Sequence, residues 1–200
     1  MYLITIYFSY LILIFQVFNK YWLKAFLIIS ILIPSIFLTA YYSSNLFHER
    51  VNLAIDNIAT FSEMPGYVDE NGNYSSVGVR LAMTMNSWQI IKKNKIIGVG
   101  TGDFPVEYKK INELYPTSQP PTTNPHNMYV LILVQIGLVG LISMLSIFYY
   151  QIKQSFISSN RFIRDAGITL PILFLVVMWS DSYILGHFTT LMFVFFSLIF

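Results

Sequence analysis

Arg80, His126 and Asp181 are the residues of this sequence whose side chains could act on a phosphorylated substrate. A guanidinium presents a planar set of donors that matches phosphate oxygens, and a neutral imidazole can accept a proton from an attacking hydroxyl. A carboxylate can orient such an imidazole through a hydrogen bond. The three residues are far apart in the sequence, so they can act together only if the fold brings them to one place.

His126 stands where a polar stretch ends and a long apolar run begins. Asn124 suits an N-cap and Pro125 suits the first position of a helix, so we expect His126 in the first helical turn. The positive end of the helix dipole favours a neutral ring there, which is a proton acceptor. Taken by itself, the segment favours the simpler interpretation, an interfacial histidine without a catalytic role.

An amphipathic helix is predicted over about 76–94, after an irregular stretch at 43–76. Arg80 lies on its polar side, and helical side chains lean toward the N-terminus, where free backbone N–H groups favour a phosphate. The alternative, which the local sequence favours, is a solvated arginine. The expected apolar stripe of this helix consists of Leu81, Met85, Trp88 and Ile91.

The glycine-rich segment at residues 98–102 (GVGTG) is similar in composition to nucleotide-binding loops. Such loops follow a strand and open a helix, and no strand–turn–helix unit is visible here. We therefore predict a tight backbone turn that returns the chain from the helix carrying Arg80.

Composition places the chain among membrane proteins. Of its 200 residues, 55% are hydrophobic and 11% are charged, whereas charged residues make up about a quarter of a typical soluble chain. The absence of cysteine excludes disulfides and thiolate catalysis, and a net charge of +2 is too small to suggest nucleic acid as a partner. The three histidines show no metal-binding spacing, so no metal site is expected.

The apolar runs predict an all-α integral membrane protein with about five transmembrane helices and one large, partly helical external loop. We divide the chain into residues 1–42 with two spans, 43–125 as the extracytoplasmic loop between the second and third spans, and 126–200 with three spans. The five spans are expected at 1–18, 25–42, 127–150, 166–180 and 184–200.

The short loops predict the orientation of the chain in the membrane. Residues 19–24 carry two Lys and no acid, and residues 151–165 carry three basic residues and one acid. Short loops rich in Lys and Arg stay in the cytoplasm. His126, Asp181 and the long loop are therefore predicted on the extracytoplasmic face. Because the chain begins and ends inside apolar runs, we expect it to be the C-terminal half of a longer protein.

Several short segments occur together in a characteristic order. They are Arg80-Leu81 in a helix, residues 97–104 (IGVGTGDF), residues 125–129 (PHNMY), residues 135–141 (QIGLVGL) and Asp181-Ser182-Tyr183. This succession resembles the C-terminal half of the O-antigen ligase and O-antigen polymerase family. The resemblance is carried mainly by residues 80–141.

The resemblance implies a polytopic bacterial glycosyltransferase of the inner, or cytoplasmic, membrane. Its donor is a glycan linked to undecaprenyl diphosphate, its acceptor is a lipid, glycan or protein, and it uses no cofactor. Arg80 would hold the diphosphate and His126 would activate the acceptor hydroxyl, with Asp181 and Asn127 in supporting roles. Family members are usually much longer and often carry an acidic residue where this chain has Gln135.

Three other functions stay open at this point. A polymerase that joins the repeat units of O-antigen or exopolysaccharide shares the same site, so the sequence does not separate it from a ligase of lipopolysaccharide biosynthesis. A truncated, inactive membrane subunit fits the short chain. A transporter of lipid-linked sugars would need ionisable residues inside its spans, and the spans predicted here have almost none.

Overall fold

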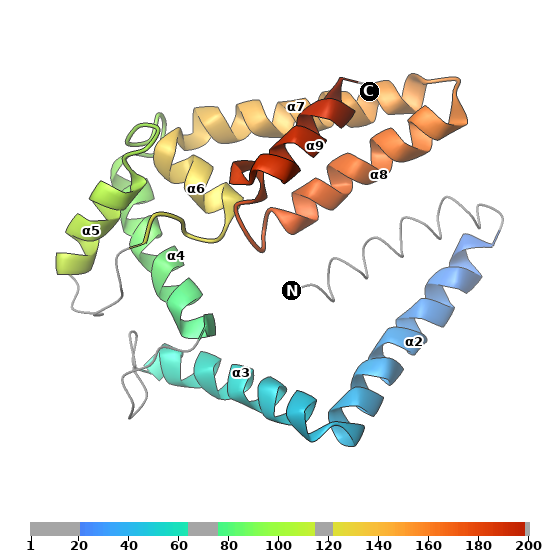
Figure 1. Cartoon of the computed structure of the whole chain (residues 1–200), viewed down its shortest axis with the longest axis horizontal. Helices are drawn as coiled ribbons and strands as arrows, with labels where there is room; N and C mark the ends of the chain where they lie inside the picture. The colour runs from blue at the N-terminus through green and yellow to red at the C-terminus, as the bar shows by residue number, and fades with distance from the viewer. Residues whose placement is uncertain (1–20, 64–75, 115–121, 199–200) are drawn as a thin grey trace. The chain divides into compact units, whose positions relative to one another are not determined.

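The computed structural model describes residues 21–63, 76–114 and 122–198. All secondary structure in these ranges is helical, which confirms the expected all-α class (Figure 1). The chain divides into two compact units, Met1–Glu63 and Met64–Phe200.

The first unit contains α2 (Trp22–Ser43) and α3 (Asn45–Glu63). Helix α2 coincides with the span expected at 25–42, and its segment Phe26–Ser43 is long and apolar enough to cross a membrane. It is the only helix in the described ranges with both properties. The number of spans therefore stays a prediction, and the span expected at 1–18 lies outside the described residues.

Helix α3 shows that the expectation of irregular structure over 43–76 is wrong for most of that stretch. Ser44 Oγ accepts a hydrogen bond from Phe47 N–H at 3.3 Å and so caps the first turn of the helix. The turn-forming residues that suggested an irregular stretch, Gly66 and Gly72 among them, all follow the end of α3 in the sequence.

Helices α4 (Ser76–Lys93), α5 (Phe104–Leu114) and α6 (Met128–Gln135) all contribute to the apolar core of the second unit. Helix α4 is the helix expected over about 76–94. Tyr108 of α5 is fully buried in this core, and burial raises the pKa of its hydroxyl. A hydrogen bond from the Asn86 amide to the Tyr108 oxygen, at 3.5 Å, opposes part of that rise and ties α4 to α5.

The buried face of α4 differs from the expected stripe. Met85 and Trp88 are about half exposed, at 48% and 53%, whereas Asn86 and Ser87 are buried. Ser87 Oγ donates to Met83 O at 2.6 Å, so its burial leaves no hydroxyl unpaired. The spacing of apolar residues did not predict this buried face, because two of the residues on it, Asn86 and Ser87, are polar.

Helices α7 (Gly137–Ile157) and α8 (Arg161–Val177) form an antiparallel hairpin (Figure 1). The prediction of a polar loop over 151–165 is wrong for most of that stretch, because only residues 158–160 separate the two helices. Asn160 caps α8 by accepting hydrogen bonds from the backbone N–H groups of its first turn. The polar residues before it continue α7 rather than ending it.

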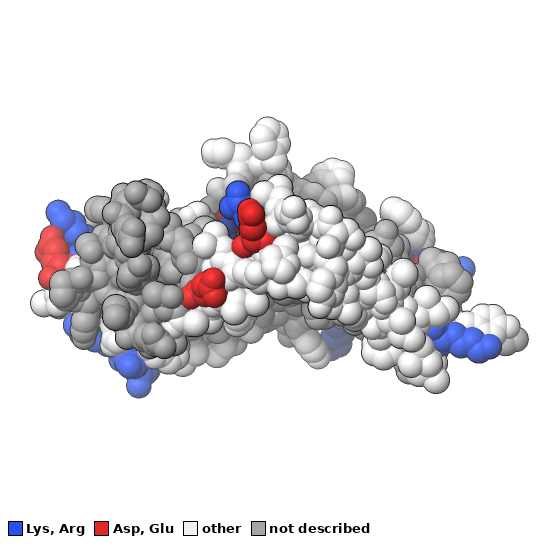
Figure 2. Space-filling model, turned by 90° about the horizontal axis from the view of Figure 1, so that it is seen from below, with Lys and Arg blue, Asp and Glu red and all other residues white. Residues whose placement is uncertain are grey.

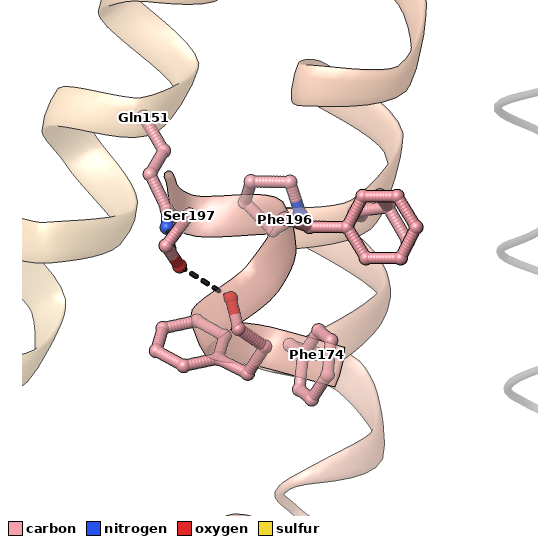
Figure 3. A pocket seen from close by; sticks show the side chains of 7 residues that line it. Gln151, Phe174, Phe196 and Ser197 are labelled. Carbon is pink, nitrogen blue, oxygen red and sulfur yellow. Dashed lines mark hydrogen bonds between the residues drawn. The ribbon is translucent and has the colours of Figure 1, made fainter. Parts of the chain in front are cut away.

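Helix α9 (His187–Ser197) follows the short 3-10 turn Tyr183–Leu185 and packs against both helices of this hairpin. The ring of Phe193 lies 5.2 Å from the rings of Phe148 and Phe174, measured between centroids. Figure 3 shows the small pocket beside these rings, where Gln151 of α7 approaches Ser197 of α9.

The prediction of a single helix over 127–150 is wrong. This stretch of the chain contains two helices, α6 and α7. The break falls at Ile136, and Gly137 begins α7 with a φ of +69°. An apolar run is compatible with a single helix, so its composition does not reveal the break. The reason for the break lies in a distant part of the chain, described below.

Candidate functional site

The break between α6 and α7 is filled by the turn that follows α4. Val99 N–H donates to Val134 O at 2.8 Å, and Gly100 N–H donates to Gln135 O at 2.9 Å, so the turn pairs carbonyls at the end of α6. Leu138 N–H in turn donates to Lys95 O at 2.9 Å. The ends of a helix leave backbone groups without partners, and this turn supplies partners on both sides of the break.

Glycine is required where the two backbones meet. A Cβ on Gly98 would lie 2.4 Å from Gln135 C, and a Cβ on Gly137 would lie 2.3 Å from Ile96 O. Gly98, Gly100 and Gly102 all have positive φ angles, of 70°, 116° and 90°. The predicted tight turn is therefore confirmed, and Gly98 is the glycine of this turn that permits the close contact with the backbone of Gln135.

This turn fixes the relative direction of α4 and α6. It joins the C-terminal ends of the two helices, so their N-terminal ends lie on the same side of the core (Figure 1). Arg80 lies near the N-terminal end of α4, and His126 lies two residues before α6. The fold therefore directs both residues toward one end of this unit.

His126 does not lie in the first turn of a helix, as was expected. Helix α6 begins at Met128, and Asn127 is its N-cap, with its Oδ1 accepting from Val130 N–H at 3.1 Å. Asn124 instead uses its Oδ1 to accept from His126 N–H at 2.9 Å, which forms a turn. His126 has a φ of 51° and is the only described non-glycine residue with positive φ.

The ring of His126 contacts Asp181. The Nδ1 atom lies 3.1 Å from Asp181 Oδ1, although the residues are 55 positions apart, and both side chains are about 40% exposed. A carboxylate at Nδ1 holds the tautomer whose proton is on Nδ1, which leaves the lone pair of Nε2 for accepting a proton. A partly exposed pair of this kind can serve as a general base for a substrate hydroxyl.

The contact depends on how α6 docks against the end of α8. Met128 N–H donates to Met178 O at 2.9 Å, and the Tyr129 hydroxyl donates to Leu175 O at 2.6 Å. Asn127 Nδ2 also donates to the carbonyl of Trp179, at 3.2 Å. The last carbonyls of α8 would otherwise lack helical partners.

Arg80 is not brought into contact with this pair. Its side chain is exposed, and its guanidinium makes no ion pair or hydrogen bond with any residue that the structure describes. Its backbone carbonyl accepts a hydrogen bond from Thr84 Oγ1 at 2.8 Å. The structure therefore brings His126 and Asp181 together, but it does not bring Arg80 to them.

An open groove of about 600 Å³ lies beside α5, and Thr122 and Thr123 form part of its wall. The same two threonines lead along the chain to His126, which does not itself line the groove. Within the described ranges, no group of three or more His, Asp or Glu side chains could hold a metal ion.

The sequence analysis gave no role to Ser182, and it predicted Asn124 as the N-cap that is in fact Asn127. Both residues form part of the hydrogen bonding around His126, through Ser182 Oγ and Asn124 Oδ1, which are 2.6 Å apart. No local signal could have revealed this bond, because it joins residues 58 positions apart.

Comparison with known proteins identifies a family that this chain matches. The model of the O-antigen ligase family matches residues 1–145, which include Arg80, His126 and Asn127. Asp181 lies beyond the matched residues. A comparison with curated proteins found no match.

Proposed function

Because the chain belongs to the O-antigen ligase family, whose members are membrane proteins, we propose that it transfers a glycan from undecaprenyl diphosphate to an acceptor hydroxyl. The reaction takes place at the extracytoplasmic face of the bacterial inner membrane. The observation that carries this proposal is the contact of 3.1 Å between His126 Nδ1 and Asp181 Oδ1.

His126 is the general base of the proposed transfer. The acceptor oxygen attacks the anomeric carbon of the donor, its proton passes to His126 Nε2, and the bond from that carbon to the diphosphate breaks. The diphosphate leaves with the electron pair and stays on the lipid carrier. Proton transfer of this kind accelerates a reaction by typically about 10²–10⁴-fold. Asp181 holds the ring and stabilises the imidazolium that forms.

Arg80 binds the leaving diphosphate. Its guanidinium is exposed and has no partner among the described residues, and a planar fork of donors suits two phosphate oxygens. Charge neutralisation of the leaving group then replaces the need for a strong acid. Asn127 supports the site by capping α6 and by bonding the Trp179 carbonyl, which keeps His126 beside α8.

The proposed topology has five spans, with residues 43–125 on the extracytoplasmic side of the membrane. Helix α7 has 21 residues, and at 1.5 Å per residue its length of roughly 31 Å matches the bilayer core. It carries large exposed apolar side chains, among them Leu138, Val139 and Ile142. The described surface in Figure 2 is mostly uncharged, with isolated acidic and basic groups. Both features suit contact with lipid.

Profiling surface glycans and polyprenyl-linked intermediates in a deletion strain tests this proposal. For a ligase we expect long lipid-linked polymer to accumulate while the acceptor stays unmodified. Loss of long chains, with single repeat units still transferred, would instead identify a polymerase that uses the same chemistry. Unchanged glycans and intermediates would contradict a transferase and favour an inactive subunit.

A further inference from the structure

The backbone of His126 adopts a conformation that needs support. A φ of 51° is uncommon for a residue other than glycine, and such conformations persist where the surroundings hold them in place. The neighbouring Pro125 is fully buried, which anchors the chain on one side of the histidine. The specific support comes from the side chain of Asn124.

Asn124 Oδ1 accepts two hydrogen bonds. One comes from His126 N–H at 2.9 Å and the other from Ser182 Oγ at 2.6 Å. An amide oxygen has two lone pairs, so both are used. The backbone of Asn124 is itself fixed by Thr122, whose Oγ1 accepts from Asn124 N–H at 3.2 Å and donates to Asn124 O at 2.8 Å.

Ser182 links this turn to the carboxylate. It is 5% exposed, its hydroxyl donates to Asn124, and its backbone N–H donates to Asp181 Oδ1 at 2.7 Å. The same Oδ1 atom contacts His126 Nδ1. Asn124, His126, Asp181 and Ser182 therefore form a closed ring of hydrogen bonds. Within it, Ser182 bonds both Asp181 and the residue that supports His126, Asn124.

We infer that Asn124 and Ser182 are positioning residues, which set the distance and angle of the His126–Asp181 pair for the proposed transfer. This inference rests on the proposed function. A purely structural role, holding α6 against α8, does not require these two side chains. Met128 N–H and the Tyr129 hydroxyl already make that junction through bonds of 2.9 Å and 2.6 Å to α8 carbonyls.

The test compares three variants of the full chain in membranes: Ser182→Ala, Asn124→Ala and the double variant. We expect each to lower kcat by at least about tenfold, because small misplacements of a catalytic group are costly, while KM for the lipid-linked donor stays within about twofold. Because Ser182 acts through Asn124, the kcat of the double variant should be no lower than the kcat of Asn124→Ala. The pH profile of kcat should also shift, since the contact between His126 and Asp181 is altered.

Ser180→Ala is the matched control, because the Ser180 hydroxyl donates to Val177 O at 2.8 Å and has no bond to Asn124. It should keep wild-type kcat. A Ser182→Ala variant with the same kcat and pH profile as Ser180→Ala would overturn the inference, as would losses that add in the double variant. Ser182→Thr keeps the hydroxyl and should recover activity if Ser182→Ala folds poorly; an inactive but folded Ser182→Thr would count against the inference. If His126→Ala is inactive while Ser182→Ala is normal, this inference fails and the proposed function stands.

Discussion

The ring of His126 and the carboxylate of Asp181 are 55 residues apart in the sequence and 3.1 Å apart in space. One residue precedes α6 at its N-terminal side, and the other follows the end of α8. The pair therefore forms only when these two helices dock, which makes its geometry a direct readout of the fold of this unit.

Replacing Asp181 by Asn should lower kcat of glycan transfer by about 10–100-fold, less than the loss of the base itself. An amide can donate to Nδ1, which would stabilise the tautomer with its proton on Nε2 and remove the acceptor. Initial rates with a lipid-linked donor would check this. A variant with wild-type kcat would show that the carboxylate does not orient the ring.

Replacing Arg80 by Ala should raise KM for the donor by about tenfold or more, because a charge-assisted contact with the diphosphate is lost. Arg80→Lys should recover only part of the affinity, since an ammonium keeps the charge but not the fork of donors. Lys92→Ala is the control: Lys92 is an exposed cation at the opposite end of α4. Equal effects of Arg80→Ala and Lys92→Ala would argue against a diphosphate site at Arg80.

Gly98→Ala and Gly137→Ala should destabilise the protein more than Gly102→Ala. All three glycines have positive φ, so an alanine at any of them costs about 1–2 kcal/mol of backbone strain. Only at Gly98 and Gly137 would the new Cβ also collide with backbone, whereas nothing lies within 4 Å at Gly102. Thermal unfolding of the detergent-solubilised variants measures the difference. Equal unfolding temperatures for the three variants would mean that the backbones at Gly98 and Gly137 do not approach their neighbours closely enough to exclude a Cβ.

The orientation of the chain can be checked by cysteine labelling, because the sequence contains no cysteine that must first be removed. Thr123 is exposed and lies three residues before His126, so Thr123→Cys should react with an impermeant maleimide on intact cells. Ser159→Cys, in the exposed turn between α7 and α8, should react only after the membrane is permeabilised. The reverse pattern would place His126 and Asp181 on the cytoplasmic side.

Local sequence signals predicted the features that depend on few neighbouring residues. The bounds of α2 and α4 follow from hydrophobic runs and helix formers, and the turn at residues 98–102 follows from its glycines. The proximity of His126 to Asp181 was suggested by topology, since both were assigned to one face. Their catalytic roles are still predictions.

Features decided by distant partners were missed. Asn124 and Asn127 are equally good N-caps by composition, and the choice falls on Asn127 because Asn124 Oδ1 is occupied by His126 N–H and Ser182 Oγ. The break at Ile136 likewise depends on hydrogen bonds with residues 95–100, which an apolar run cannot reveal. In both cases a local preference was overridden by tertiary hydrogen bonding.

The most direct measurement of the central claim is complementation of a deletion strain with the wild-type chain and with His126→Ala, at matched levels in the membrane. We predict that the wild type restores surface glycan and that His126→Ala leaves lipid-linked glycan accumulated, with transfer reduced by about 10²–10⁴-fold. Restoration of wild-type glycan by His126→Ala would contradict the proposed role, and would leave His126 as a structural residue of the turn before α6.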